Sequence, residues 1–190
     1  GLSAAYFLRQ MGHDVTIFES MPNAGGMLRY GIPEYRLPKA VLDEEIATIE
    51  SMGVEIITNT KVGVDITFET IRSDYDAVLL GIGAWVSTGV GCKGEDAEGV
   101  IGGIDFLRRV VRNEEIGMGR KVAIVGGGNT AMDACRTAVR LGAEEVYNIY
   151  RRTKDEMPAD MVEIEEAEEE GVIFKNLTNP IEVVKDENGH

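Results

Sequence analysis

The sequence predicts an α/β protein made of two lobes with parallel sheets, of which the first lobe is incomplete. Two observations support this fold class. Residues 121–152 follow a strand–turn–helix–strand pattern, and residues 1–19 follow a helix–strand pattern that has no strand before it. Parallel strands joined by helices form an open sheet with helices on its faces. We expect the first lobe over residues 1–98 and the second over residues 99–190.

The second lobe carries a glycine-rich turn between a strand and a helix. An apolar run over residues 122–125 is followed by three glycines and then by apolar residues at helical spacing. The small residues of G-x-G-x-x-A each have a mechanical role. Gly126 makes the tight turn, Gly128 allows a pyrophosphate to approach the backbone, and Ala131 lets the helix pack against the strand. The helix begins near Asn129 and directs its free N–H groups towards phosphates. This predicts a Rossmann-like dinucleotide site; an ordinary glycine-rich turn is the alternative.

The residues after the second strand of this unit indicate which nucleotide binds. A site for NAD usually has Asp or Glu there to accept hydrogen bonds from the ribose. This chain has Arg151 and Arg152 instead. A guanidinium pairs with phosphate through two hydrogen bonds, so this position favours the 2′-phosphate of NADP. A solvated basic strand end is the other reading.

The first lobe reads as the second half of another dinucleotide fold. Residues 2–11 have helical spacing, and residues 13–18 alternate like a strand that ends at Glu19. Gly1 would be the third glycine of a fingerprint whose strand and first two glycines are absent, so we expect a fragment. Glu19 stands where a carboxylate binds the ribose, although a glutamate at a strand end is also a common surface residue.

The remaining stretches connect these units. Gly25 and Gly26 permit close approach of a ligand within an irregular loop, which could equally be a simple connector. The expected helices cover residues 39–52, 104–111 and 160–170, and the last reads as a solvated acidic face. The expected strands cover residues 54–57, 75–80 (a buried strand that runs into glycines 81–84), 172–177 and 181–184. Residues 86–103 would join the lobes, and residues 187–189 would form a turn.

Composition excludes several classes of function. The formal net charge of -14 argues against nucleic acid and against an anionic membrane surface. Cys92 and Cys135 form no C-x-x-C pattern, which argues against a metal or disulfide redox site and fits a cytoplasmic location. No nucleophile–base or paired-carboxylate arrangement is present, so we expect no catalytic side chain.

Four stretches, taken in order, resemble one family: Glu19, GGMLRYGIPEYRLPK from Gly25, GGGNTAMD from Gly126, and YRRTKDEMPA from Tyr150. They are similar to the small-subunit family of NADPH-dependent glutamate synthase, which includes the FAD/NADPH region of dihydropyrimidine dehydrogenase. The resemblance implies a flavoprotein with an NADPH domain inserted into a FAD domain. By resemblance, the FAD residues are Gly1, Glu19, Gly25, Gly26, Met27, Arg36, Val62 and Gly83. The NADPH residues are Gly126, Gly128, Asn129, Thr130, Ala131, Arg151 and Arg152.

The resemblance also implies an activity. The intact protein would transfer hydride from NADPH to FAD and pass electrons to iron–sulfur clusters in missing regions or in a partner, with glutamate synthesis as the output. We expect the fragment alone to be inactive and to purify without flavin while keeping a weakened affinity for NADP. The implied partner is the large glutamate synthase subunit or a similar electron acceptor. A nucleotide-binding module without turnover and a single-cofactor NAD(P) dehydrogenase are the alternatives. Apolar surface left by the absent first strand predicts that the fragment forms a homodimer.

Overall fold

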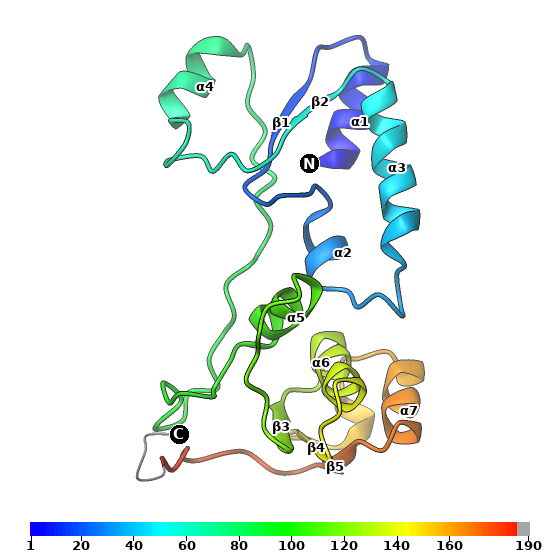
Figure 1. The fold of residues 1–190 in the computed structure, drawn as a ribbon, viewed down its shortest axis with the longest axis vertical. Helices are drawn as coiled ribbons and strands as arrows, with labels where there is room; N and C mark the ends of the chain where they lie inside the picture. Colours follow the sequence, from blue (N-terminus) through cyan, green and yellow to red (C-terminus); the bar gives the residue numbers. More distant parts are fainter. Residues whose placement is uncertain (186–190) are drawn as a thin grey trace. The chain divides into compact units, whose positions relative to one another are not determined.

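The structure, a computed structural model, describes residues 1–185. The chain divides into two compact units. The first contains Gly1–Arg29 and Glu34–Ala84, and the second contains Tyr30–Pro33 and Trp85–His190. Each unit has helices packed on a parallel sheet, which confirms the predicted fold class (Figure 1).

The first unit has a two-stranded sheet. Strand β1 (Thr16–Phe18) pairs in parallel with β2 (Glu55–Ile57). Its small core consists of Ala24, Leu42 and Ile46, with Leu2 and Ile56 packed against them. The helices of this part of the chain are α1 (Leu2–Gln10), α2 (Gly26–Tyr30), α3 (Lys39–Ser51) and α4 (Phe68–Asp74). The sequence pattern anticipated α1 and α3 but not the short helices α2 and α4.

The buried strand expected over residues 75–80 is wrong. The structure has no strand there, and Val78, Leu79 and Leu80 are 38%, 62% and 69% exposed. Unpaired strand edges leave backbone groups without hydrogen bonds, so a strand forms only where another strand lies beside it. No described strand pairs with this stretch. The apolar run predicted a buried strand, but strand pairing is a tertiary property that the run itself does not contain, and the run is exposed here.

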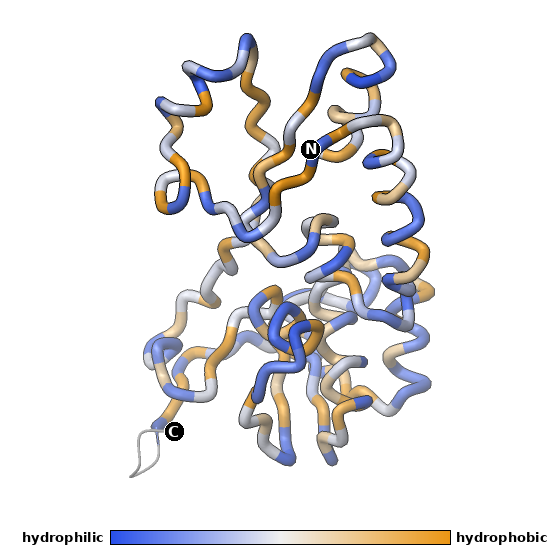
Figure 2. The backbone as a smooth tube through the Cα atoms, turned by 45° about the horizontal axis from the view of Figure 1, so that its top comes forward, coloured by the Kyte–Doolittle hydropathy of each residue, from blue (hydrophilic) through white to orange (hydrophobic). Residues whose placement is uncertain are grey.

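The second unit is a three-stranded parallel sheet in the order β3-β4-β5. Its strands are β3 (Lys121–Val125), β4 (Glu145–Ile149) and β5 (Ile173–Lys175). Figure 2 shows the apolar character of the strands against their hydrophilic connecting loops. The helices are α5 (Gly103–Val111), α6 (Asn129–Arg140) and α7 (Met161–Glu169), with a 3-10 turn, η1 (Lys154–Glu156). Helices α6 and α7 are the crossovers that join successive strands, and they lie side by side (Figure 1).

The core of the second unit lies between the sheet and its two crossover helices. Met132, Cys135 and Ala138 of α6 and Ile164 and Ala167 of α7 are completely buried. Of the two strands expected after α7, the first is β5, whereas the second forms only an isolated bridge between Lys93 and Glu182. The turn expected at residues 187–189 lies outside the described residues.

Candidate functional site

The glycine turn after β3 has the geometry of an open anion site. Gly126 adopts a φ of +148°, which L side chains rarely adopt, and its N–H donates to the Ile149 carbonyl at 3.0 Å. Ala131 lies close behind it, since a Cβ on Gly126 would be 3.3 Å from the Ala131 Cβ. Gly128 begins α6 without a capping side chain, and a Cβ built on it meets nothing within 4 Å. The Ala131 N–H bonds the Gly128 carbonyl at 2.9 Å, whereas the N–H groups of Asn129 and Thr130, at the start of α6, have no side-chain cap.

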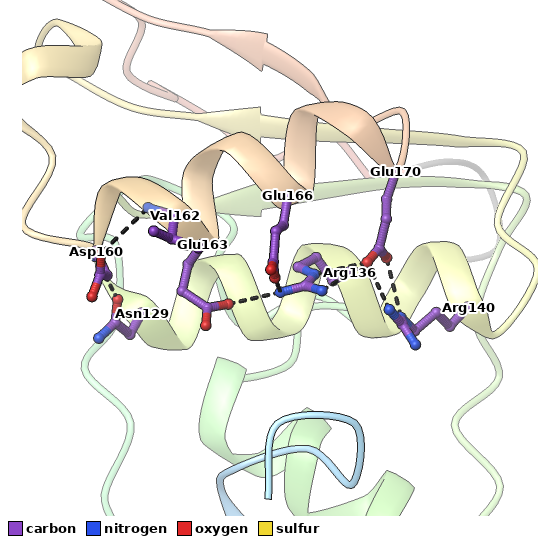
Figure 3. A network of polar contacts seen from close by, with 8 residues as sticks. All are labelled: Asn129, Arg136, Arg140, Asp160, Val162, Glu163, Glu166 and Glu170. Atoms are coloured by element: carbon purple, nitrogen blue, oxygen red, sulfur yellow. Dashed lines mark hydrogen bonds and ion pairs between the residues drawn. The ribbon is translucent and has the colours of Figure 1, made fainter.

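The oxygens of this turn are bonded by donors from later in the chain. The Asn148 Nδ2 donates to the Gly126 carbonyl at 2.8 Å, and the Ala159 N–H donates to the Gly127 carbonyl at 3.0 Å. The Asp160 N–H donates to the Asn129 Oδ1 at 2.9 Å (Figure 3). With these acceptors bonded, the turn presents mainly N–H donors, which suits a negatively charged group. The sequence motif identified the turn but not these donors, because nothing in their spacing marks them.

The middle glycine of the turn is required by an aromatic ring. A Cβ on Gly127 would lie 2.5–2.8 Å from ring carbons of Tyr150, closer than real contacts allow. The Tyr150 hydroxyl donates to the Glu156 carbonyl at 2.9 Å. Tyr150 thus joins the glycine turn to the loop that follows β4. Sequence reasoning placed Tyr150 at a strand end and missed this link.

The loop after β4 presents two arginines. Arg151 and Arg152 are exposed, and neither forms an ion pair with a residue in the described part of the chain. Lys154, in contrast, pairs with Glu168 at 2.6 Å. Thr153 and Glu156 form a capping box, and hydrogen bonds from the Thr153 backbone and side chain lower the pKa of Glu156. The loop is therefore held in shape while both guanidinium groups remain available to a phosphate. Thr130, also expected at this site, is exposed in the first turn of α6.

The acidic helix α7 is not simply a solvated face, which corrects the sequence expectation. The Arg136 side chain, only 6% exposed, pairs with Glu163 at 2.8 Å, Glu166 at 2.5 Å and Glu170 at 2.8 Å. Arg140 also reaches Glu170, at 2.7 Å (Figure 3). Burial raises the pKa of the Glu170 carboxyl, but hydrogen bonds from Arg140 and Arg136 outweigh burial and lower it overall. This cluster fixes α7 on α6, and Asp160, which donates to Asn129, is the N-cap of α7.

Residues expected to bind FAD are spread over the first unit. The Glu19 Oε1 accepts a hydrogen bond from the Met21 N–H at 2.8 Å, which fixes the carboxylate at the end of β1. Gly1 and Gly81 approach closely, with the Gly1 nitrogen 3.1 Å from a Cβ built on Gly81. The loop glycine Gly25, at a φ of +129°, has no room for a side chain because Leu42 would lie 2.9 Å away. The other expected residues are half-buried (Gly26, Met27 and Arg36) or exposed (Val62 and Gly83).

Arg29 fixes the loop that carries these glycines, although the sequence did not single it out. Its Nε donates to the Ala24 carbonyl, and its guanidinium pairs with Asp43 of α3. A nearby pocket of about 260 Å³ is lined by Pro22, Asn23, Ala24, Arg29, Asp43, Ile46, Glu50, Ile56 and Thr58. None of the residues expected to bind FAD lines it, although Ala24 and Arg29 of its lining adjoin Gly25.

Among residues 1–185, no helix is both long and apolar enough to cross a membrane. No group of three or more His, Cys, Asp or Glu residues in the same range is placed to hold a metal ion.

Comparison with known proteins assigns a family. The profile described as pyridine nucleotide-disulphide oxidoreductase matches residues 1–190. The chain is 50% identical over 187 residues to the NADP(+)-dependent formate dehydrogenase subunit beta of Moorella thermoacetica, covering 97% of this chain and 26% of that protein. It is 38% identical over 200 residues to the glutamate synthase [NADPH] small chain of Escherichia coli strain K12, covering 100% and 42%. The resemblance found in the motifs is thereby confirmed.

A solved structure gives the same fold. The chain superposes on Mycobacterium tuberculosis FprA in complex with NADPH with a TM-score of 0.80 at 17% identity. The match covers 97% of this chain and 58% of that one. At this identity the likeness supports the fold alone. The chain spans 26% of the length of the formate dehydrogenase subunit and 42% of the length of the glutamate synthase chain.

Proposed function

Because the chain belongs to the pyridine nucleotide-disulphide oxidoreductase family, we propose that it carries the nucleotide sites of an NADPH-dependent flavoprotein oxidoreductase. The proposed reaction is hydride transfer from NADPH to FAD, followed by transfer of electrons to a further acceptor. The NADPH residues are Gly126, Gly128, Asn129, Thr130, Ala131, Arg151 and Arg152. The FAD residues are Gly1, Glu19, Gly25, Gly26, Met27, Arg36, Val62 and Gly83.

The proposal rests on two features that occur together: a helix start without a capping side chain, and two arginines without an ion-pair partner in the described part of the chain. The start of α6 offers N–H groups to a pyrophosphate, and Arg151 and Arg152 follow the adjacent strand β4 without an ion-pair partner among residues 1–185. A 2′-phosphate carries negative charge that the ribose of NADH lacks, and a guanidinium can bind it through two hydrogen bonds. The arrangement therefore supports NADPH over NADH.

The residues of this chain bind and orient rather than react. When bound, the flavin supplies the hydride and electron chemistry, as cofactors generally do. The fixed Glu19 carboxylate has a second oxygen with which to accept a hydrogen bond from a ribose hydroxyl. Gly25 keeps the loop backbone free of a side chain. None of these roles requires an acid, a base or a nucleophile.

The electron acceptor is the finer part of the proposal. We propose a partner subunit as the acceptor, because the relatives at 50% and 38% identity are named as a subunit or chain of larger enzymes. Glutamate synthesis, with the large glutamate synthase subunit as partner, is the narrower form. The more similar of these two relatives is named for formate rather than glutamate. The names therefore support hydride transfer from NADPH to FAD more strongly than they support glutamate synthesis.

Oxidation of NADPH by an artificial acceptor tests the proposal. The purified intact protein that contains this chain, supplied with FAD, should oxidise NADPH and reduce ferricyanide, and should use NADPH in preference to NADH. NADPH binding without any turnover, in a sample shown to contain stoichiometric flavin, would favour a binding module instead. Glutamate formation after addition of a large glutamate synthase subunit would separately test the narrower form.

A further inference from the structure

A buried polar residue lies directly behind the glycine turn. Asn148 of β4 is 0% exposed. One of its amide hydrogens points to the Gly126 carbonyl at 2.8 Å, and the Nδ2 also lies 3.8 Å from the Cys135 sulfur. Burial raises the pKa of the Cys135 thiol to about 12, so the sulfur remains a neutral thiol beside the amide.

The packing of Asn148 is unfavourable by itself. Its Oδ1 is buried without a hydrogen-bond partner among residues 1–185. A buried acceptor without a partner costs stability, whereas an apolar side chain of similar shape has no such group to satisfy. The amide cannot simply turn over, because its oxygen would then face the Gly126 carbonyl oxygen at the present 2.8 Å separation. The unpartnered oxygen therefore offsets part of the stability that the bond to Gly126 contributes.

We propose that Asn148 is a positioning residue for the pyrophosphate-binding turn. Gly126 is held at both polar groups by consecutive residues of β4: its N–H by the Ile149 carbonyl at 3.0 Å, and its carbonyl by Asn148. In a planar trans peptide the C=O and the following N–H point in opposite directions. Holding the Gly126 carbonyl towards the buried amide therefore directs the Gly127 N–H away from Asn148 and the core. This orients a donor for the phosphates that NADPH and NADH share.

This inference rests on the proposed function of the turn as a pyridine-nucleotide site. The test compares Asn148→Leu with wild type in the full chain, by titration with NADPH and NADH and by thermal melting. Asn148→Leu should raise the Kd of both nucleotides about three- to tenfold, the range that one hydrogen bond carries. Its melting temperature should change little, because the variant removes the unpartnered Oδ1 but also leaves the Gly126 carbonyl without this donor. Asn148→Ala removes the same donor without added bulk, and should give the same rise in Kd with a lower melting temperature.

Val146→Ala is the matched control. Val146 is 2% exposed, lies two residues earlier on the same face of β4, and makes no hydrogen bond to the turn through its side chain. This variant should melt earlier yet bind both nucleotides as wild type does, when measured well below its melting temperature. Unchanged Kd values in Asn148→Leu and Asn148→Ala would overturn the inference alone, as would a loss confined to NADPH. A wild-type protein that binds neither nucleotide would overturn the proposed function and this inference with it.

Discussion

The two nucleotide-binding regions of this chain differ in how their residues are held. In the second unit, α6 is buried along most of its length, and donors from β4 and from the loop before α7 bond the glycine turn. In the first unit, α1 buries only Ala5, and the sheet has two strands. The Glu19 carboxylate is fixed mainly by the adjacent Met21 N–H. The glycine turn of the second unit is therefore held by residues tens of positions away in the sequence, whereas the Glu19 carboxylate is held by a near neighbour.

The difference teaches where binding specificity and rigidity come from. In the second unit, the residues proposed to contact NADPH are few, but the hydrogen bonds that place them involve Asn148, Tyr150, Ala159 and Asp160. Preorganised donors bind an anion without a further ordering cost. Substitutions behind the site should therefore matter more in the second unit than in the first.

The largest expected effect follows from replacing Arg136, the buried arginine that binds the glutamates of α7. Arg136→Ala removes the partner that Glu163, Glu166 and Glu170 share, although Glu170 keeps a second one, Arg140. Removal of one member of a buried pair costs about 3–5 kcal/mol of unfolding free energy. Arg9→Ala is the counterpart in the first unit, where Arg9 bonds the Met52 carbonyl and the exposed Asp14. It should cost about 1 kcal/mol. Urea unfolding measures the stability of both variants. Equal losses of unfolding free energy would contradict the proposed difference between the two units.

The same cluster predicts an acid dependence. The pKa of Glu170 is lowered in the folded state, so its contribution to stability is present above its unfolded pKa and lost as pH falls through the folded value. The unfolding free energy of the second unit should therefore decrease between roughly pH 5 and pH 3. Fluorescence of Trp85, the single tryptophan, reports on this unit. Arg136→Ala should show a shallower decrease, and identical slopes would count against the assignment.

Core truncations extend the comparison to packing. Ile164 is completely buried in the larger cluster, whereas Ile46 is 7% exposed in a cluster of three buried residues. Ile→Ala substitutions leave cavities whose cost depends on how far the surroundings relax. We expect losses of about 3–4 kcal/mol at Ile164 and about 2 kcal/mol at Ile46. Urea unfolding followed by circular dichroism checks this, and a larger loss at Ile46 would reverse the comparison.

The sequence predicted elements whose signal is local. The turn from Gly126 to Gly128 and the helix after it follow from glycine placement and helical spacing within a few residues. The strand expected over residues 75–80 was wrong because an apolar run does not specify a pairing partner. The role of α7 was hidden because Arg136 and its carboxylates lie 27–34 residues apart in sequence. Asn148 was missed for the same reason, since its bond to Gly126 spans 22 residues.

The next largest effect concerns the preference for NADPH over NADH. The double substitution Arg151→Ala and Arg152→Ala should weaken NADPH binding by about 1.5–3 kcal/mol, the range for hydrogen bonds to charged groups. NADH lacks the 2′-phosphate, so its Kd should change little. Lys154→Ala is a control from the same loop, because Lys154 is already paired with Glu168. Titration of each variant with both nucleotides decides, and equal losses for NADPH and NADH would refute the 2′-phosphate assignment.

The smallest effect concerns Glu19, where the first unit relies on a local contact. Glu19→Gln keeps an oxygen that can accept from the Met21 N–H, so the end of β1 should retain its shape. It replaces a charged acceptor with a neutral one at the proposed ribose contact. The affinity for FAD should fall by about 1 kcal/mol, or roughly fivefold, because a bond to a charged group becomes a neutral one. Glu19→Ala also loses the Met21 bond and should bind FAD more weakly than Glu19→Gln. Flavin fluorescence titration measures both.

If the two variants lose equal affinity while remaining folded, the fixed carboxylate is not what positions the ribose. If neither loses any, Glu19 is the surface residue that its strand-end position alone would suggest.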